Sequence, residues 1–200
     1  MYICRMIPKD EIIKSQIVEA SKSVFRRYGY RKVSMEDIAK ACGKGRSTLY
    51  YYFKNKQEVL EEVALQEYMS ITEPAAKQVT KEKSISQNLF QYNQVKLKAL
   101  IQKTEEYDHL FIDIKENPEF LFRMFQKIRQ KEILLIKKCL EWAMEKEEIA
   151  PIYQEDLEFL AMAMVTAVGS LEKEMLLYGS IDEMGNRLPW LVNLLIKGLK

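Results

Sequence analysis

Residues 45–56 read GRSTLYYYFKNK and place four consecutive aromatic side chains between basic residues. At about 100° per residue, a helix through this stretch puts Leu49 and Phe53 within about 40° of each other. The same rotation directs a set of hydroxyl-bearing side chains away from that pair: Ser47, Thr48 and Tyr51, with Tyr50 and Tyr52 at the flanks. We therefore predict a short helix that is packed on one side and exposed to water on the other.

Two more helices are predicted ahead of this stretch. Apolar residues recur at helical spacing at Ile13, Ile17, Ala20, Val24 and Tyr28, and Gly29 follows as a residue that accepts the left-handed position at a helix end. Ser34 is a natural N-cap with an acidic residue three positions on, and Gly43 ends the short helix that it begins. Helix, glycine-containing turn and helix is the helix-turn-helix arrangement, whose second helix enters the DNA major groove.

The remainder of the chain also reads with helical period, so the predicted fold is all-α with about nine helices. Asn55 is a good cap for a fourth helix, which Pro74 should kink or end because proline lacks the N–H. Ser84 or Ser86 can open the next one, and Asn117-Pro118 reads as the start of another. Two apolar helices close the chain. One covers residues 155–178, and the other runs to the C-terminus with Leu188, Leu191 and Leu195 on one side.

Composition narrows the class of protein. Residues 1–60 hold 13 Lys and Arg against 6 Asp and Glu, whereas residues 61–200 hold 18 against 23, so a basic N-terminal third precedes a slightly acidic remainder. This asymmetry suggests a part that binds a polyanion. Three cysteines and one histidine favour neither a disulfide framework nor a zinc site, and no nucleophile–base pair or cofactor motif is evident. We expect a cytoplasmic protein without enzyme activity, metal, cofactor or membrane span.

The order and spacing of these residues resemble the tetracycline-repressor (TetR) family of bacterial regulators. The matching positions are residues 17–21, 24–25, 28–30, 33–39, 43, 48–53, 56 and 60. The resemblance implies a head, residues 1–55, that binds double-stranded DNA. It further implies an effector-binding and dimerisation domain, residues 56–200, in which residues 56–73 form the connecting helix.

The resemblance also implies roles for individual residues of the head. Ser34 and Lys56 would contact phosphates at two helix N-termini, Tyr50 and Tyr52 would touch the backbone, and the base edges would be approached by Ser47, Thr48 and Tyr51. The chain departs from the family at Lys44, where a small apolar residue is usual, and at Gly45, where serine is usual. We interpret Lys44 and Arg46 as additional phosphate or guanine contacts, in a turn that could be looser than is typical.

For the second domain the resemblance implies a homodimer, which would present two heads to a palindromic operator, and an unidentified small-molecule effector. Candidates for the dimer interface are Ala163, Ala167, Ser170, Leu191 and Leu195. Candidates for the effector pocket are Phe111, Phe125, Glu132, Trp142, Met164 and Glu172. Glu132 and Glu172 interrupt apolar stripes of their helices. In a pocket they would select a cationic or donor-rich ligand. The alternative is that they lie at stripe edges in water or pair with Lys or Arg.

We thus expect a transcriptional regulator, most simply a repressor released by its effector. The alternative is a DNA-binding architectural or protein-interaction module that responds to no effector.

Overall fold

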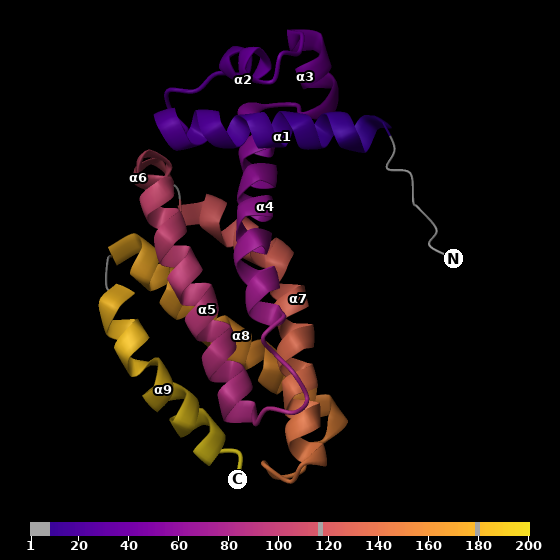
Figure 1. Ribbon diagram of the computed structural model, residues 1–200, viewed down its shortest axis with the longest axis vertical. Coiled ribbons are helices and arrows are strands. Elements are labelled where there is room, and N and C mark those ends of the chain that lie inside the picture. Colours follow the sequence, from indigo (N-terminus) through magenta and orange to yellow (C-terminus); the bar gives the residue numbers. More distant parts are fainter. Residues whose placement is uncertain (1–8, 116–117, 179–180) are drawn as a thin grey trace. The chain divides into compact units, whose positions relative to one another are not determined.

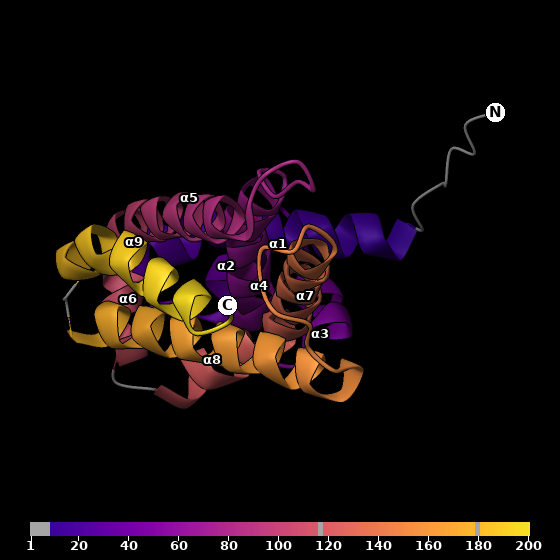
Figure 2. The same cartoon turned by 90° about the horizontal axis from the view of Figure 1, so that it is seen from below.

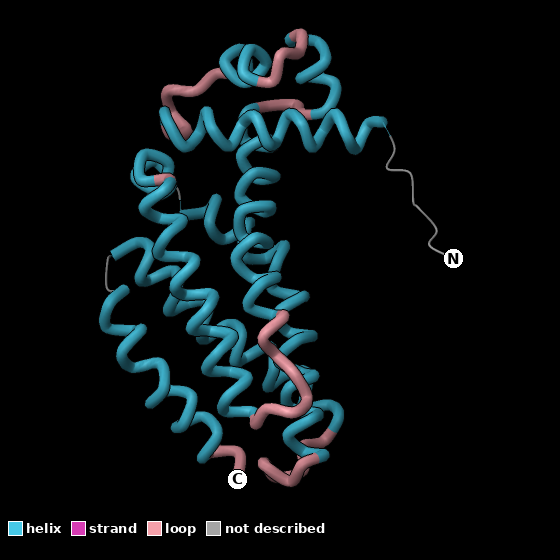
Figure 3. Tube along the Cα trace, viewed as in Figure 1, coloured by secondary structure: helices cyan, strands magenta, loops and turns pink. Residues whose placement is uncertain are grey.

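A computed structural model of the chain describes residues 9–115, 118–178 and 181–200. Within these ranges it contains nine helices and no strand (Figure 3). The helices belong to two compact units, the first made of residues 1–66 and 105–120 and the second of residues 67–104 and 121–200. The chain therefore passes from one unit to the other three times.

The first unit is built on α1 (Lys9–Tyr28), the longest helix that lies entirely within it. The two short helices α2 (Met35–Ala41) and α3 (Arg46–Tyr52) lie along one side of α1, and α6 (Asp108–Lys115) packs against α1 as well (Figure 1). The first turns of α4 (Lys56–Ala76) complete this unit. Its core includes apolar side chains with no exposed surface: Ile17, Val18, Phe25, Ile38, Leu49 and Val59.

Local signals in the sequence account for the helix ends of this unit. The Ser34 hydroxyl accepts from the Asp37 N–H, and the Asp37 carboxylate accepts from the Ser34 N–H at 2.9 Å, which is the predicted capping box. The Asn55 side chain accepts from the Glu58 N–H at 2.9 Å and caps α4 as predicted. Gly29 has a φ of 74°, in the left-handed region where glycine is favoured.

One expectation for α1 is wrong. Tyr28 was placed on its apolar stripe, but the residue is 47% exposed and its ring lies beneath the Arg27 guanidinium, 5.2 Å from the ring centroid. Tyr28 is the last residue of the helix, so its ring has no next turn to pack against and lies along a neighbouring cation instead.

The second unit is a helical bundle. It contains most of α5 (Ile85–Glu106), α7 (Pro118–Glu145), α8 (Gln154–Tyr178), α9 (Ile181–Lys197) and the last turns of α4. Figure 2 views these helices from below, with α9 beside α8 and α5 above them. Buried apolar residues from α5, α7, α8 and α9 form one core, which includes Leu89, Leu140, Leu157, Ala161 and Val192.

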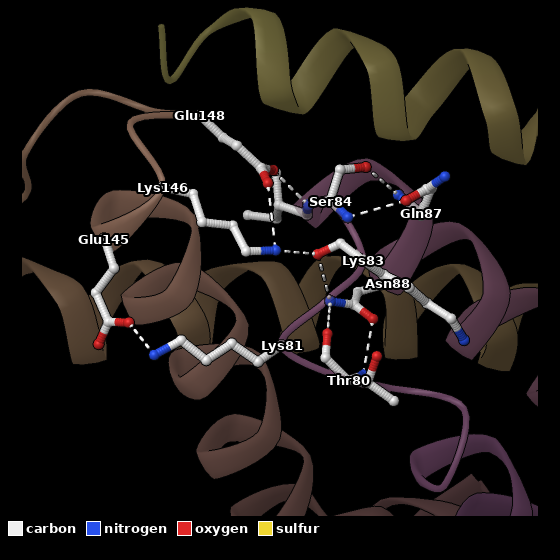
Figure 4. A network of polar contacts seen from close by, with 10 residues as sticks. Thr80, Lys81, Lys83, Ser84, Gln87, Asn88, Glu145, Lys146 and Glu148 are labelled. Atoms are coloured by element: carbon white, nitrogen blue, oxygen red, sulfur yellow. Dashed lines mark hydrogen bonds and ion pairs between the residues drawn. The ribbon is translucent and has the colours of Figure 1, made fainter.

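Polar contacts fix one end of this bundle, where the loop before α5 meets the turn after α7 (Figure 4). The Lys146 ammonium donates to the Lys83 carbonyl at 2.8 Å, and Lys81 pairs with Glu145. The Glu148 carboxylate accepts from the Ile85 N–H at 2.6 Å, at the N-terminus of α5 where a negative charge is favoured. Ser84, one of the two predicted caps of α5, accepts from the Gln87 N–H at 3.2 Å.

The proline in α4 ends that helix as predicted. Pro74 lies in its last turn, and the helix stops two residues later at Ala76. The missing N–H of a proline removes one hydrogen bond to the preceding turn, which makes a stop at this point favourable.

The packing of α3 gives a direct stability prediction. Leu49→Ala leaves a cavity in the core of the first unit, and we expect it to lower the free energy of unfolding by about 2–5 kcal/mol. Tyr51→Ala is the matched control, because Tyr51 is 75% exposed two residues further along the same helix. Urea denaturation of both variants measures the difference; equal losses would contradict the packing described here.

Candidate functional site

The turn between α2 and α3 is closed by two backbone hydrogen bonds. The Lys44 N–H donates to the Ala39 carbonyl at 3.1 Å, and the Gly43 N–H donates to the Lys40 carbonyl at 3.2 Å, which together form a Schellman motif. Gly43 takes the left-handed position, with a φ of 62°. The turn is therefore regular, and the looser turn that the departures at residues 44 and 45 suggested is not what the structure has.

The two sides of α3 differ as the helical rotation predicts. Leu49 is fully buried and Phe53, which caps the helix, is 3% exposed. On the opposite side Tyr51 is 75% exposed and Ser47 is also exposed, while Thr48 is half-buried. Only one side of this helix is anchored in the unit, and hydroxyl groups line the side that faces water.

Basic and aromatic groups flank that exposed side. The Arg46 guanidinium lies 5.5 Å from the centroid of the Tyr50 ring, and Tyr50 itself is 42% exposed. Gly45 supplies no side-chain cap at the N-terminus of α3, and Lys44, just before it, is half-buried. A cation stacked on an aromatic face loses fewer rotamers when it binds a partner, since part of its freedom is already gone.

Tyr52 is engaged within the head. Its hydroxyl donates to the Asp10 carboxylate at 2.8 Å, which joins the end of α3 to the first turn of α1. That hydrogen bond is the main reason that the pKa of Tyr52 is raised to about 12. A phosphate contact from this hydroxyl would therefore require a change of partner.

Ser34 and Lys56 also bond within the head. The Ser34 hydroxyl donates to Asp37 at 2.5 Å, and the Lys56 ammonium donates to the carbonyls of Tyr30 at 2.7 Å and Val33 at 2.6 Å. Partial burial lowers the pKa of Lys56. An ammonium has three donors, so Lys56 has one beyond these two carbonyls, and its Nζ also lies 4.2 Å from the centroid of the Tyr30 ring.

The structure adds a contact that the sequence analysis missed. The Asp113 carboxylate of α6 accepts from the backbone N–H groups of Tyr30 at 2.6 Å and Arg31 at 2.9 Å, in the loop after α1. A side chain at Gly29 would lie 2.7 Å from this carboxylate, so glycine is needed there for close approach as well as for its φ. No local sequence pattern predicts a hydrogen bond between residues about 80 positions apart.

A cluster of charged side chains is buried in the second unit. The Lys96 ammonium of α5 pairs with Glu132 of α7 at 2.8 Å and with Glu172 of α8 at 2.7 Å, and the three residues are 3%, 7% and 1% exposed. The Tyr92 hydroxyl donates to the same Glu132 oxygen at 2.6 Å. Of the alternatives for the two acids, the one that placed them in water is wrong, and the pairing with a lysine is confirmed.

Burial and charge compete in this cluster. Burial alone would lower the pKa of Lys96, but the two carboxylates raise it above its ordinary value. Burial raises the pKa of Glu172, against the opposing effect of Lys96. Lys96 was missed in the sequence, although its place among Ile85, Leu89 and Tyr92 on one stripe of a helix was a signal of burial.

The other pocket candidates are dispersed. Met164 lies with Glu132 and Lys96 around a small cavity in the second unit. Phe111 belongs to α6 of the first unit, and the Trp142 ring is half-buried beneath the Lys138 ammonium. The side chain of Phe125 lies outside the described residues.

The candidates for a dimer interface lie largely on the surface. Ala163, Ala167 and Ser170 are exposed on α8, Leu195 is 36% exposed on α9, and Leu191 is half-buried. Large apolar side chains accompany them, which the sequence analysis did not single out: Phe159, Leu171, Trp190 and Leu194 are all more than 40% exposed. A patch formed by large exposed apolar side chains is typical of an interaction site.

Two features together define the class of protein. The first unit carries a helix-turn-helix whose second helix offers its polar side to solvent, and the second unit is a separate helical bundle. Such a molecule is a DNA-binding transcriptional regulator with an additional helical domain.

Comparison with known proteins identifies the family of the DNA-binding part. Residues 17–63, which include the helix-turn-helix, match the model of the bacterial regulatory proteins of the tetR family. The HTH-type transcriptional regulator YhgD of Bacillus subtilis (strain 168) is 23% identical over 159 residues, which is 78% of this chain and 81% of that protein.

Solved structures agree with the fold. A transcriptional regulator from Cytophaga hutchinsonii ATCC 33406 superimposes with a TM-score of 0.63 at 20% identity, over 92% of this chain and 97% of that one. The fatty acid degradation regulator FadR from Bacillus halodurans superimposes with a TM-score of 0.59 at 18% identity, over 94% and 96%. At such identities the likeness concerns the fold.

Within the part of the chain that the structure describes, no helix combines the length and the apolar character needed to cross a bilayer.

The buried cluster yields a prediction about pH. Because the pKa of Glu172 is raised in the folded state, the folded protein keeps a proton that the unfolded chain has already lost above about pH 4.3. Stability should therefore fall as pH rises through the folded pKa of Glu172. Glu172→Gln should remove that part of the decline, whereas Glu174→Gln, an exposed acid on the same helix, should leave it unchanged.

Urea denaturation of the three proteins at several pH values from about 5 to 8 measures this difference. If the wild-type and Glu172→Gln proteins lose stability in parallel over that range, the carboxyl of Glu172 is ionised throughout and the predicted direction is wrong.

Proposed function

We propose that the chain is a homodimeric repressor that binds a palindromic operator through two copies of α3 and leaves it when a small-molecule effector binds the second unit. In this proposal residues 1–55 form the DNA-binding domain, and residues 56–73 form the helix that connects it to the rest of the chain. The remainder binds the effector and forms the dimer interface. The protein would act in the cytoplasm, on duplex DNA.

The observation that carries the DNA-binding part is the two-sided packing of α3. With Leu49 fully buried and Tyr51 75% exposed, the helix offers Ser47, Thr48 and Tyr51 for base edges without unfolding any part of the head. Hydroxyl groups can donate hydrogen bonds to base edges or accept hydrogen bonds from them. Most protein–DNA hydrogen bonds, however, are made to phosphates and sugars.

Phosphate contacts are assigned to the surrounding cations and hydroxyls: Ser34, Lys44, Arg46, Tyr50, Tyr52 and Lys56. The basic excess of residues 1–60 supports this assignment, because neutralised phosphates release counterions and so contribute to affinity. For Tyr52 we expect exchange of the Asp10 bond for a phosphate, and for Lys56 use of its remaining donor.

Dimerisation is supported by the exposed apolar residues of α8 and α9. Small residues at Ala163, Ala167 and Ser170 permit close approach of a second helix, and Leu191 and Leu195 would pack beside Trp190 and Leu194. Two heads about one DNA turn (~34 Å) apart would then read two half-sites.

An effector would act by a shift of population. The effector releases DNA only to the extent that it binds the conformer that cannot span two half-sites more tightly than the conformer that can. The coupling free energy between effector binding and DNA binding is typically about 1–3 kcal/mol. Glu132, Glu172 and Met164 remain the pocket candidates that we propose for it, with Phe111, Phe125 and Trp142 as more distant ones.

The operator part is tested by selection of bound duplexes from a random pool with the full-length protein. Enrichment of a palindrome is expected, and Tyr51→Ala should reduce the discrimination among sequences by about 1–3 kcal/mol for each base pair that it reads. Binding without any enriched sequence would favour the architectural alternative. A thermal-shift screen of metabolites and drugs, followed by gel shifts on the enriched duplex, then tests the effector.

Lys56 gives a separate test of the phosphate contacts. Lys56→Ala should weaken binding to every sequence and lower the slope of log K against log salt by about one unit. Lys77→Ala, an exposed lysine of the second unit, should change neither quantity. If the slope is unchanged in Lys56→Ala, Lys56 contacts no phosphate, and its role is confined to its hydrogen bonds with the loop after α1.

A further inference from the structure

An arginine of the second unit lacks a charged partner. Arg129 on α7 donates one hydrogen bond, from its Nη2 to the hydroxyl of Thr166 on α8 at 2.9 Å. Among the side chains that the structure describes, no carboxylate forms an ion pair with Arg129, and its Nε is buried without an acceptor. A guanidinium carries five N–H donors, so Arg129 has capacity for a further acceptor.

The contact with Thr166 restricts the position of the guanidinium. The Thr166 hydroxyl donates to the Met162 carbonyl at 2.7 Å, one turn earlier in α8, so its oxygen is directed to accept from Arg129. A side chain that is already held in this way loses less rotamer freedom when it binds a ligand.

Arg129 lines a groove between α7 and α8 that has a volume of about 100 Å³. A single water needs about 10–15 Å³ of such space, so the groove has room for a small organic molecule. Its other described walls are Gln126, Glu132, Val165, Thr166, Gly169 and Lys173.

Gly169 leaves the groove open on the side of α8. A Cβ atom added at this position would have no atom of another residue within 4 Å beyond its own stretch of helix. Glycine is less favourable than alanine in the interior of a helix, and no close packing in the described structure requires it here. The missing side chain therefore provides space that a bound molecule can occupy.

The acid in the groove already has its own partners. The Oε1 of Glu132 receives the Lys96 ammonium at 2.8 Å and the Tyr92 hydroxyl at 2.6 Å, and Glu132 is only 7% exposed. Lys173 lines the groove as well and adds positive potential to it. The groove thus offers the Arg129 guanidinium to an anion, while the charge of Glu132 limits how much negative charge that anion can carry.

On the basis of the proposed effector-responsive function, we propose that this groove binds the carboxylate of a small organic acid, which pairs with the Arg129 guanidinium. A carboxylate is planar and accepts two parallel N–H bonds, a geometry that matches the fork of a guanidinium. The body of the acid lies against Val165 and in the space beside Gly169. The acid binds in its ionised form, so no proton is transferred.

Other classes of ligand fit this groove less well. A phosphate monoester carries nearly two negative charges at neutral pH, and Glu132 would repel the second one. An amine would bring a further cation to a groove that already holds Arg129 and Lys173. A neutral amide has one acceptor oxygen and no charge, so its bond to a guanidinium is weaker.

Four probes that share a phenyl ring separate these cases. Benzoate, benzamide, benzylamine and phenyl phosphate are titrated into the full-length protein at about pH 7, and ligand-observed NMR measures the affinity of each. We expect benzoate to bind at least tenfold more tightly than each of the other three. A smaller preference, or no binding of benzoate, would overturn the proposal.

Substitutions locate the binding site. Arg129→Gln should weaken benzoate binding at least tenfold, because glutamine has neither the charge nor the fork of the guanidinium. Lys131→Gln removes an exposed cation from the same helix and should leave the affinity unchanged. If Arg129→Gln binds benzoate as the wild-type protein does, the carboxylate binds elsewhere and the proposal is wrong.

Gly169→Leu is a second variant that does not alter Arg129. Its side chain should fill the groove and weaken benzoate binding at least tenfold, so it decides the matter even if Arg129→Gln does not fold. Circular dichroism establishes that each variant is folded. Unchanged affinity in folded Gly169→Leu would contradict the proposed site.

Failure of this inference is distinguishable from failure of the proposed function. If benzoate binds as described but does not release the selected duplex in a gel shift, the carboxylate site stands and the effector mechanism is wrong for it. If another class of compound releases the duplex while benzoate does not bind, the inference is wrong and the proposed function stands.

Discussion

Leu49 and Phe53 attach α3 to the core of the first unit, and the direction of every exposed group on that helix follows from this attachment. A helix of seven residues is too short to be stable by itself, so its position depends on burial rather than on propensity. Two large apolar side chains at helical spacing supply that burial. Because they occupy one side of the helix, the hydroxyl groups of Ser47 and Tyr51 are left in water.

The second unit is organised by a different kind of contact. Apolar side chains from four helices form its core, but Lys96 adds a charged connection among α5, α7 and α8 at one place within it. Apolar contacts tolerate small shifts of packing, whereas a buried ammonium with two carboxylates requires particular distances. Such a group contributes little net stability, yet removal of one partner is expensive, and this favours one arrangement of the three helices.

Features that arise within a few residues were predictable from the sequence. The capping box of Ser34, the Asn55 cap and the two faces of α3 each depend on spacing along a single helix, and the structure has all of them. Contacts between distant positions were not predictable. Glu132 and Glu172 were recognised as unusual, but their shared partner lies 36 and 76 positions earlier in the chain, and the Tyr52–Asp10 bond spans 42 positions.

The bonds between α6 and the loop after α1 bear on how the head can be isolated. Tyr30 and Arg31 offer their N–H groups to Asp113, which belongs to a chain segment that returns to the first unit only after residue 104. A fragment that ends anywhere between residues 55 and 104 keeps the whole helix-turn-helix. It leaves the N–H groups of Tyr30 and Arg31 without their acceptor and exposes the side of α1 against which α6 packs. The compact unit that holds the DNA-binding part is therefore discontinuous in the sequence, and an excised N-terminal peptide lacks the contacts that α6 supplies.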